Sequence, residues 1–212
     1  MEDPSPKRAA PDTPFLDGWL GVHGLIVSSP GFDAFSDDDS LTSFAAGIGA
    51  ELGAVGGGRL AAVAGISLGG DEAGYRGQNA ELSVVRITLG PELRFPFGGR
   101  FFGYGRLSPE LVHFTAELAD DSSTTTLEQN EWLFGVDTAL GLAMRIADLR
   151  PQGMTAPLSI FARLEAGYTW SPETELSLSP QGSDGPIRSE PLAVGDLSLS
   201  GVSFRGALGV GY

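Results

Sequence analysis

The chain has 212 residues, 31 of them glycine and none of them cysteine, and its formal net charge is -14. This glycine content disfavours a helical bundle, and the missing cysteine excludes disulfides and thiolate metal sites. The 13 basic residues are scattered singly, so no basic stripe is available for phosphates and nucleic acid is excluded as a partner. No apolar run is long enough for a transmembrane helix.

Residues 1–14 carry four prolines and mixed charge, which predicts a disordered leader before a single domain at 15–212. The leader lacks the apolar core of a secretory signal peptide. If the protein is exported, we therefore expect this numbering to describe a chain whose signal peptide has been removed.

Eight runs of alternating character follow the leader, at about 15–28, 42–52, 59–69, 80–95, 100–116, 130–146, 157–170 and 197–212. At about 3.3 Å per residue and a tilt near 40°, ten residues of each run would cross roughly 25 Å, the apolar band of a transmembrane barrel. The connections alternate between short ones, at 53–58, 96–99 and 147–156, and longer acidic ones, at 29–41, 70–79, 117–129 and 171–196. The sequence therefore predicts an all-β fold, an eight-stranded antiparallel up-and-down transmembrane β-barrel with short periplasmic turns and longer acidic external loops.

Sorting each run by parity separates an aliphatic and aromatic face from a face of charge and glycine. The polar faces together hold seven arginines and seven carboxylates: Asp17, Glu51, Arg59, Arg86, Glu92, Arg94, Arg106, Glu110, Glu131, Asp137, Arg145, Arg163, Glu165 and Arg205. An unpaired charge inside a barrel costs several kcal/mol, so a balanced set predicts a lumen closed by ion pairs. His23 is expected inside as a hydrogen-bonded residue, whereas Trp19 and Tyr104 fit the polar face less well.

The last run, LSLSGVSFRGALGVGY, places Val202, Phe204, Leu208, Val210 and Tyr212 on one face and stops on an aromatic residue. It resembles the closing strand of bacterial outer-membrane β-barrels, although Ala207 stands where that family usually has glycine. The strand count is similar to the small OmpA and OmpX type of barrel. The resemblance implies the outer membrane of a Gram-negative bacterium, outer-membrane lipids as partners, and a non-enzymatic role as envelope anchor, structural protein or adhesin. It also implies envelope partners, met through the external loops or the leader.

Alternatives remain open at this point. A small pore would need the charged lumen to be clear, and a soluble lipocalin-like barrel would have the two faces inverted. His113 and Thr115 share the outward face of their run and faintly resemble the His-x-Ser pair of outer-membrane lipid A deacylases, with threonine in place of serine. Pro109 could introduce a bulge that turns His113 inward.

No cofactor is predicted from the sequence. Asp37, Asp38 and Asp39 could offer oxygen ligands to a divalent cation, but their spacing matches no defined calcium loop and favours a solvated acidic tip.

Overall fold

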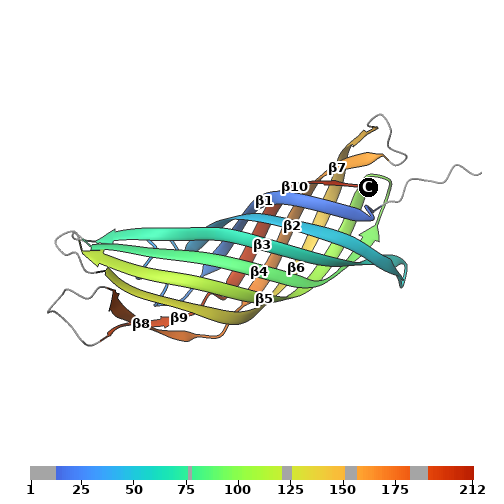
Figure 1. The fold of residues 1–212 in the computed structure, drawn as a ribbon. Coiled ribbons are helices and arrows are strands. Elements are labelled where there is room, and N and C mark those ends of the chain that lie inside the picture. Colours follow the sequence, from blue (N-terminus) through green and yellow to red (C-terminus); the bar gives the residue numbers. More distant parts are fainter. Residues whose placement is uncertain (1–12, 76–77, 121–125, 151–156, 182–190) are drawn as a thin grey trace, which may run out of the picture.

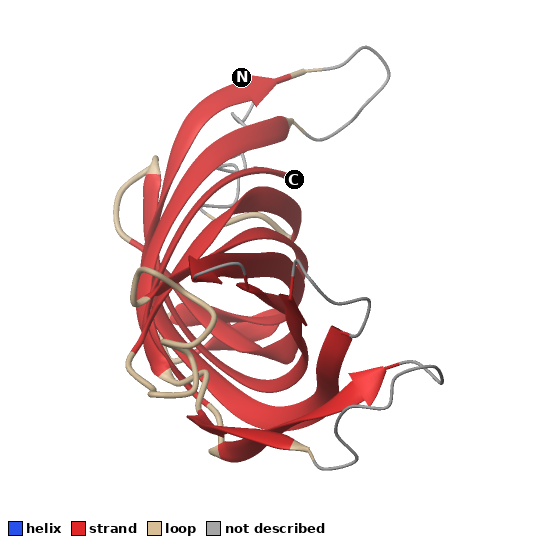
Figure 2. Ribbon diagram, turned by 90° about the vertical axis from the view of Figure 1, so that its left-hand side faces the viewer, coloured by secondary structure: helices blue, strands red, loops and turns tan. Residues whose placement is uncertain are grey.

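The structure is a computed structural model that describes residues 13–75, 78–120, 126–150, 157–181 and 191–212. Its strands are β1 (Leu16–Val27), β2 (Ser40–Val55), β3 (Gly58–Tyr75), β4 (Gln78–Pro96), β5 (Phe101–Asp120), β6 (Thr126–Leu149), β7 (Leu158–Trp170), β8 (Thr174–Gln181), β9 (Leu192–Leu197) and β10 (Gly201–Gly211). Figure 2 shows strands and loops throughout these ranges. None of them contains a helix long and apolar enough to cross a membrane.

Eight of these strands close into a ring (Figure 1). The order around the ring is β1, β2, β3, β4, β5, β6, β7 and β10, and β10 pairs back onto β1. All eight pairings are antiparallel. The eight predicted runs correspond to these strands, so the predicted all-β antiparallel architecture is confirmed. Closure pairs each of these strands on both sides and so removes the free edges of an open sheet.

The two ends of the ring differ. At one, the turn end, Gly56 and Gly57 join β2 to β3 with φ values of 55° and 83°. A two-residue type I′ hairpin turn needs positive φ at both central residues, which glycine adopts without strain. Residues 97–100 join β4 to β5 at this end, and the backbone N–H of Phe15 donates to the carbonyl of Tyr212. Both ends of the described chain therefore meet at the turn end.

The opposite end, the loop end, carries residues 28–39 and a hairpin formed by β8 and β9. The prediction of an open loop at 171–196 is wrong here, because β8 and β9 raise the strand count from eight to ten. The loops predicted at 70–79 and 117–129 are also largely strand. β3 runs to Tyr75 and β4 begins at Gln78, while β5 and β6 stay paired up to Ala119 and Thr126.

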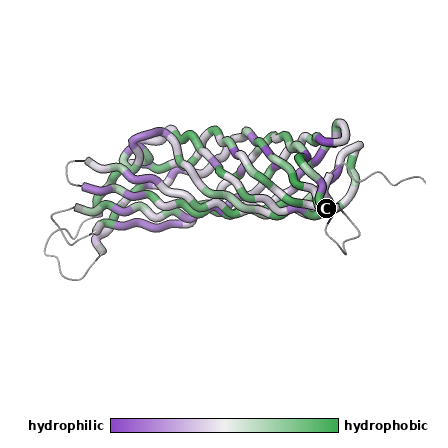
Figure 3. Tube along the Cα trace, turned by 90° about the horizontal axis from the view of Figure 1, so that it is seen from above, coloured by the Kyte–Doolittle hydropathy of each residue, from purple (hydrophilic) through white to green (hydrophobic). Residues whose placement is uncertain are grey.

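Side chains alternate between the inside and the outside of the ring. Outward aliphatic and aromatic residues are widely exposed, reaching 71% for Leu20, 74% for Leu140 and 79% for Phe44. Inward Arg94 and Arg163, by contrast, are 0% and 1% exposed. The ring therefore turns hydrocarbon outward and charge inward, which is the reverse of a lipocalin-like barrel in water. Figure 3 follows this alternation along the strands and shows long hydrophilic stretches at the loop end, at its left.

The register also settles the position of His113. β4 and β5 keep the same pairing register from Gln78↔Asp120 to Pro96↔Phe102. Pro109 therefore introduces no bulge that shifts the register between these strands. His113 pairs with Val85 and with the exposed Trp132 and stays on the outward face.

Candidate functional site: the charged interior and the capped loop end

Glycine makes room for bulky side chains inside the ring. Three inward aromatic residues each lie directly opposite a glycine of the neighbouring strand, in the pairs Trp19↔Gly47, Tyr104↔Gly141 and Phe161↔Gly209. A Cβ built on Gly141 would lie 2.3 Å from Cζ of Tyr104, and one on Gly47 would lie 2.3 Å from Cζ2 of Trp19. Any side chain at these positions would collide with the aromatic ring opposite. The glycines of the polar faces therefore leave, by having no side chain, the space that interior aromatic and charged side chains fill.

Two arginines and two carboxylates form a first buried group. Arg94 contacts Asp17 at 2.7 Å and Glu92 at 2.8 Å. Arg163 contacts Glu92 at 2.5 Å and Asp17 at 3.3 Å. The guanidinium of Arg94 also donates to the carbonyl of Pro14 at 3.1 Å. Three strands, β1, β4 and β7, are thereby tied together across the turn-end half of the interior.

A second group lies beside the first. Arg106 contacts Asp137 at 3.0 Å and Glu165 at 2.9 Å, and Arg205 contacts the same two carboxylates at 3.0 and 3.1 Å. Tyr104 joins the groups, because its hydroxyl donates to Glu165 at 3.0 Å and accepts from Nε of Arg163 at 3.1 Å. Each member is thus fixed by charge-assisted hydrogen bonds, which are about twice as strong as bonds between neutral groups.

Arg86 and Glu110 form a separate buried pair at 2.8 Å, with side chains 2% and 1% exposed. The ten buried charges of the interior are five arginines and five carboxylates, namely Arg86, Arg94, Arg106, Arg163, Arg205, Asp17, Glu92, Glu110, Asp137 and Glu165. The interior is therefore neutral without outside ions.

Four residues of the predicted lumen set lie apart from this interior. Arg59 pairs with Glu51 at 2.6 Å at the turn end, where its side chain is 42% exposed. Arg145 lies 3.9 Å from Asp148, also at the turn end. Glu131 accepts a hydrogen bond from the hydroxyl of Thr174 at the loop end. Parity placed all four on the inner face, but only position along the strand decides whether that face is enclosed.

Trp19 and Tyr104 belong to the interior for a reason that polarity alone does not show. The guanidinium carbon of Arg163 lies 4.2 Å from the centroid of the Tyr104 ring and 5.8 Å from that of Trp19. An aromatic face attracts a cation, most strongly where water is excluded. His23 is 1% exposed and faces inward, but neither of its ring nitrogens has a hydrogen-bond partner within the described ranges. The hydrogen bond expected of His23 is therefore not supplied by the described residues, although its inward position agrees with the prediction.

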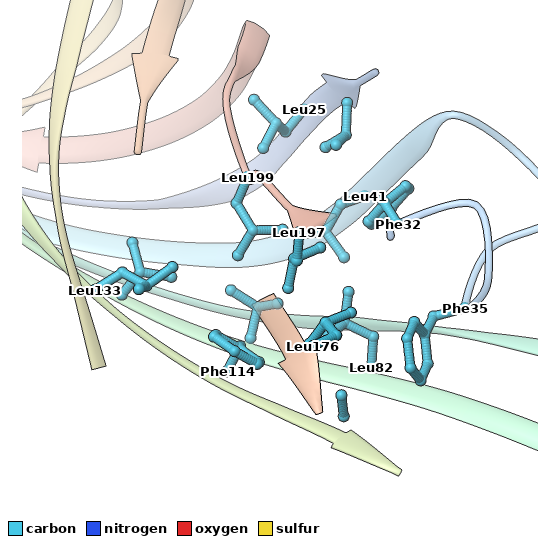
Figure 4. Packing of buried hydrophobic residues seen from close by; sticks show 14 of the residues in the cluster. Leu25, Phe32, Phe35, Leu41, Leu82, Phe114, Leu133, Leu176, Leu197 and Leu199 are labelled. Carbon is cyan, nitrogen blue, oxygen red and sulfur yellow. The ribbon is translucent and has the colours of Figure 1, made fainter. Parts of the chain in front are cut away.

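Towards the loop end the interior becomes apolar. Figure 4 shows its side chains converging from the ring strands, from residues 28–39 and from the β8–β9 hairpin. The fully buried members include Leu25, Phe32, Phe35, Leu41, Leu82, Phe114, Leu176, Leu178, Leu197 and Leu199. We call residues 28–39 together with β8 and β9 the loop-end cap. Leucines of the hairpin thus fill the mouth of the ring above the charged interior.

Four serines hold the cap to the ring. The hydroxyl of Ser29 donates to the carbonyl of Asp196 and accepts from the N–H of Ser198. The hydroxyl of Ser200 donates to the carbonyl of Ser171 and accepts from the N–H of the same residue, at 2.9 Å each. The two segments that connect the β8–β9 hairpin to β7 and β10 are therefore fixed to each other and to the end of β1.

Near the loop end the two faces of the ring exchange character. On β4, Arg86 and Arg94 point inward and Ile87 and Leu89 outward, but farther on Leu82 is inward and Glu81 outward. The outward row there places Glu72, Glu81, Glu117 and Glu128 directly opposite one another on four neighbouring strands. Adjacent like charges repel, and water with its counterions screens that repulsion. The loop end therefore has the surface and the core of a water-soluble protein.

The two weaker candidate sites gain no support from the geometry. His113 and Thr115 are half-buried on the outward face, and the ring of His113 packs against Trp132 with centroids 4.7 Å apart. Asp37, Asp38 and Asp39 are exposed, and within the described residues no group of three or more ligating side chains could hold a metal ion.

No protein-family model matches the chain, and no curated protein sequence matches it. Among solved structures it is similar to Ail, the attachment invasion locus protein of Yersinia pestis, with 14% identity and a TM-score of 0.45 over 93% of this chain and 96% of that one. Ail in complex with the heparin analogue sucrose octasulfate gives 13% identity, a TM-score of 0.46 and the same coverage. The transport unit of the autotransporter AIDA-I from Escherichia coli gives 9% identity and a TM-score of 0.39 over 100% of this chain and 93% of that one. At such low identities these likenesses say nothing of what this chain does.

Proposed function

We propose that this chain is a closed transmembrane β-barrel of a Gram-negative outer membrane, and that it acts without catalysis as an adhesion or anchoring protein through its loop-end cap. The observation that carries the proposal is the orientation of the ring, with 33 large hydrophobic residues of the described ranges exposed, most of them on its outer face, and paired charges inside. Soluble monomers rarely expose contiguous apolar patches beyond a few hundred Å². Hydrocarbon is the solvent that suits such an outer surface.

The dimensions agree with a bilayer. Outward apolar residues run from Leu16 to Ile26 on β1 and from Phe101 to Leu111 on β5. Ten residues at about 3.3 Å each and a tilt near 40° give roughly 25 Å, the height of the apolar band of an outer-membrane barrel. Exposed aromatics lie near both limits of this band, with Phe95 and Tyr212 towards the turn end and Trp132 towards the loop end. Such residues favour the two membrane interfaces.

The interior supports a closed barrel rather than a pore. An eight-stranded ring is just wide enough for side chains, and here they include ten paired charges and three aromatic residues. The apolar cap fills the mouth above them. Permeation would require both layers to move.

The binding function then belongs to the loop-end cap, which projects into water. The cap packs onto the ends of the ring strands through a shared apolar core, and it is held there by the four serines and by the short pairing of β8 with the end of β6. A rigid, water-facing platform on a membrane anchor suits binding to an external surface or to a neighbouring envelope component. Binding experiments with the intact protein will identify the partner.

Cysteine labelling tests the membrane boundary directly, because the chain contains no cysteine of its own. Single variants Glu81→Cys and Ile87→Cys place the thiol on the same outward face of β4, six residues apart. In intact cells, a membrane-impermeant maleimide should label Glu81→Cys and leave Ile87→Cys unlabelled until detergent is added. Leu82→Cys, buried in the cap, is the matched control for simple burial.

The outcome that contradicts the proposal is equal labelling at Glu81 and Ile87 in the absence of detergent, since both would then face water. Recovery of the protein in the outer-membrane fraction, with migration on gels that changes on heating, is the expected companion result. Binding of cells to a surface should be lost when the cap is removed and the ring is kept. Reproducible conductance steps in planar bilayers would instead favour the pore, and altered lipid A mass on expression would favour the deacylase.

A further inference from the structure

One small void lies inside the ring, between the second charged group and the Arg86–Glu110 pair. Its volume is about 10 Å³, and its lining includes Trp19, Arg86, Arg106 and Glu110. These four side chains are at most 6% exposed. A polar cavity of roughly 10–15 Å³ by this measure is large enough for one water molecule.

The lining carries polar atoms that the rest of the described chain leaves unpaired. The donors are Nε1 of Trp19, Nε and Nη2 of Arg86 and Nε of Arg106. The acceptor is Oε2 of Glu110, whose other oxygen is held by Arg86. A buried polar group without a hydrogen-bond partner destabilises the folded state, so several such groups on the lining of one void indicate a shared partner.

The partner has to both accept and donate. The unpaired N–H groups need an acceptor, whereas Oε2 of Glu110 needs a donor, and only a molecule with both functions can pair with both kinds of atom. An anion would also bring a charge into an interior whose five arginines and five carboxylates already balance. Water meets both conditions and has the right size.

We propose that this void is a binding site for one ordered water molecule. The water accepts hydrogen bonds from two of the surrounding N–H donors, one of them Nε of Arg106, and donates one to Glu110, which joins the Arg86–Glu110 pair to the second charged group. It is then a structural member of the interior, independent of what surrounds the ring outside and of any role of the cap.

Nuclear magnetic resonance can detect this water through Trp19. In protein labelled with ¹⁵N-tryptophan, the Trp19 indole proton should give a cross-peak at the water frequency whose sign differs between laboratory-frame and rotating-frame experiments, as dipolar contact requires and chemical exchange does not. Trp170, 51% exposed on the outward face, is the control in the same sample. Absence of the Trp19 cross-peak would overturn the proposal. A shift of the Trp19 signal when chloride is replaced by bromide would also overturn it, because an anion would then occupy the site.

Two substitutions at Ala45, which lines the void and is 6% exposed, give an independent test. Ala45→Val expels the water without replacing its hydrogen bonds, whereas Ala45→Ser brings a hydroxyl that can replace some of them. The denaturation midpoint should therefore be lower for Ala45→Val than for Ala45→Ser. A dry void predicts the opposite order, because added methyl groups would simply fill it. If either variant fails to fold, the Trp19 cross-peak decides the question alone.

Discussion

Removing one member of the Arg86–Glu110 pair should cost far more stability than removing both. The charged atoms lie 2.8 Å apart and both side chains are almost fully buried. At an effective dielectric constant of about 20, their attraction is of the order of 4–6 kcal/mol. Deleting one charge leaves the other buried without its partner, which costs about 3–5 kcal/mol, whereas replacing both with apolar groups of similar volume is often close to neutral.

A double-mutant cycle with Arg86→Met and Glu110→Leu measures this directly. We expect each single variant to lose about 3–5 kcal/mol of unfolding free energy and the double variant to recover to within about 1–2 kcal/mol of the parent protein. The assay is reversible unfolding by urea in lipid vesicles, followed by tryptophan fluorescence. Arg59→Met is the matched control, because Arg59 forms a 2.6 Å ion pair at the open turn end with 42% of its side chain exposed, and should cost less than about 1 kcal/mol.

The reasoning is refuted if Arg86→Met costs no more than Arg59→Met and the cycle shows no coupling. Bulk water would then reach the pair and solvate the remaining carboxylate. The interior could not be sealed in that case, and the proposal of a closed barrel would fall with it.

Three further outcomes are expected. Gly141→Ala should destabilise the ring by about 1–3 kcal/mol through collision with the aromatic ring opposite, whereas Gly24→Ala, with nothing within 4 Å of the new Cβ, should stay within about 0.5 kcal/mol in the same urea assay. Glu81→Lys turns two repulsive cross-strand pairs into attractive ones, and should raise stability by about 0.5–1 kcal/mol in low salt and by less in high salt. Leu176→Asp buries a carboxylate in the cap, so limited proteolysis should cut the β8–β9 hairpin while heat-modifiable gel migration of the ring is kept.

The eight ring strands were predictable because one periodicity governs each of them across the apolar band. Val202, Phe204, Leu208 and Val210 are exposed on β10 as their parity indicated. The pairings of individual charges were not predictable, because parity gives the face of a residue but not its position along the barrel axis. Arg59 and Arg106 share the inner face, yet one lies at the open end and the other in the enclosed centre.

The cap escaped prediction for a different reason. Thr174 to Ser179 reads TELSLS, a period-two pattern whose leucines at 176 and 178 are buried, but its polar residues resemble a loop. A six-residue alternation within an acidic stretch carries little weight on its own. Its partners are residues 28–39 and the ends of β4 and β5, which are far away in sequence, so only the closed ring brings the cap core together.

In the proposed orientation the same strands serve two solvents, hydrocarbon along the apolar band and water at the loop end. Along β4, inward and outward side chains alternate without a break. Between Arg86 and Val84, however, the inward side chains pass from charged to apolar. Within hydrocarbon the cheapest arrangement keeps charge inside, and in water it keeps charge outside. The position of that change on β4 is therefore where the proposed orientation puts the membrane boundary, between the sites of the Glu81→Cys and Ile87→Cys variants.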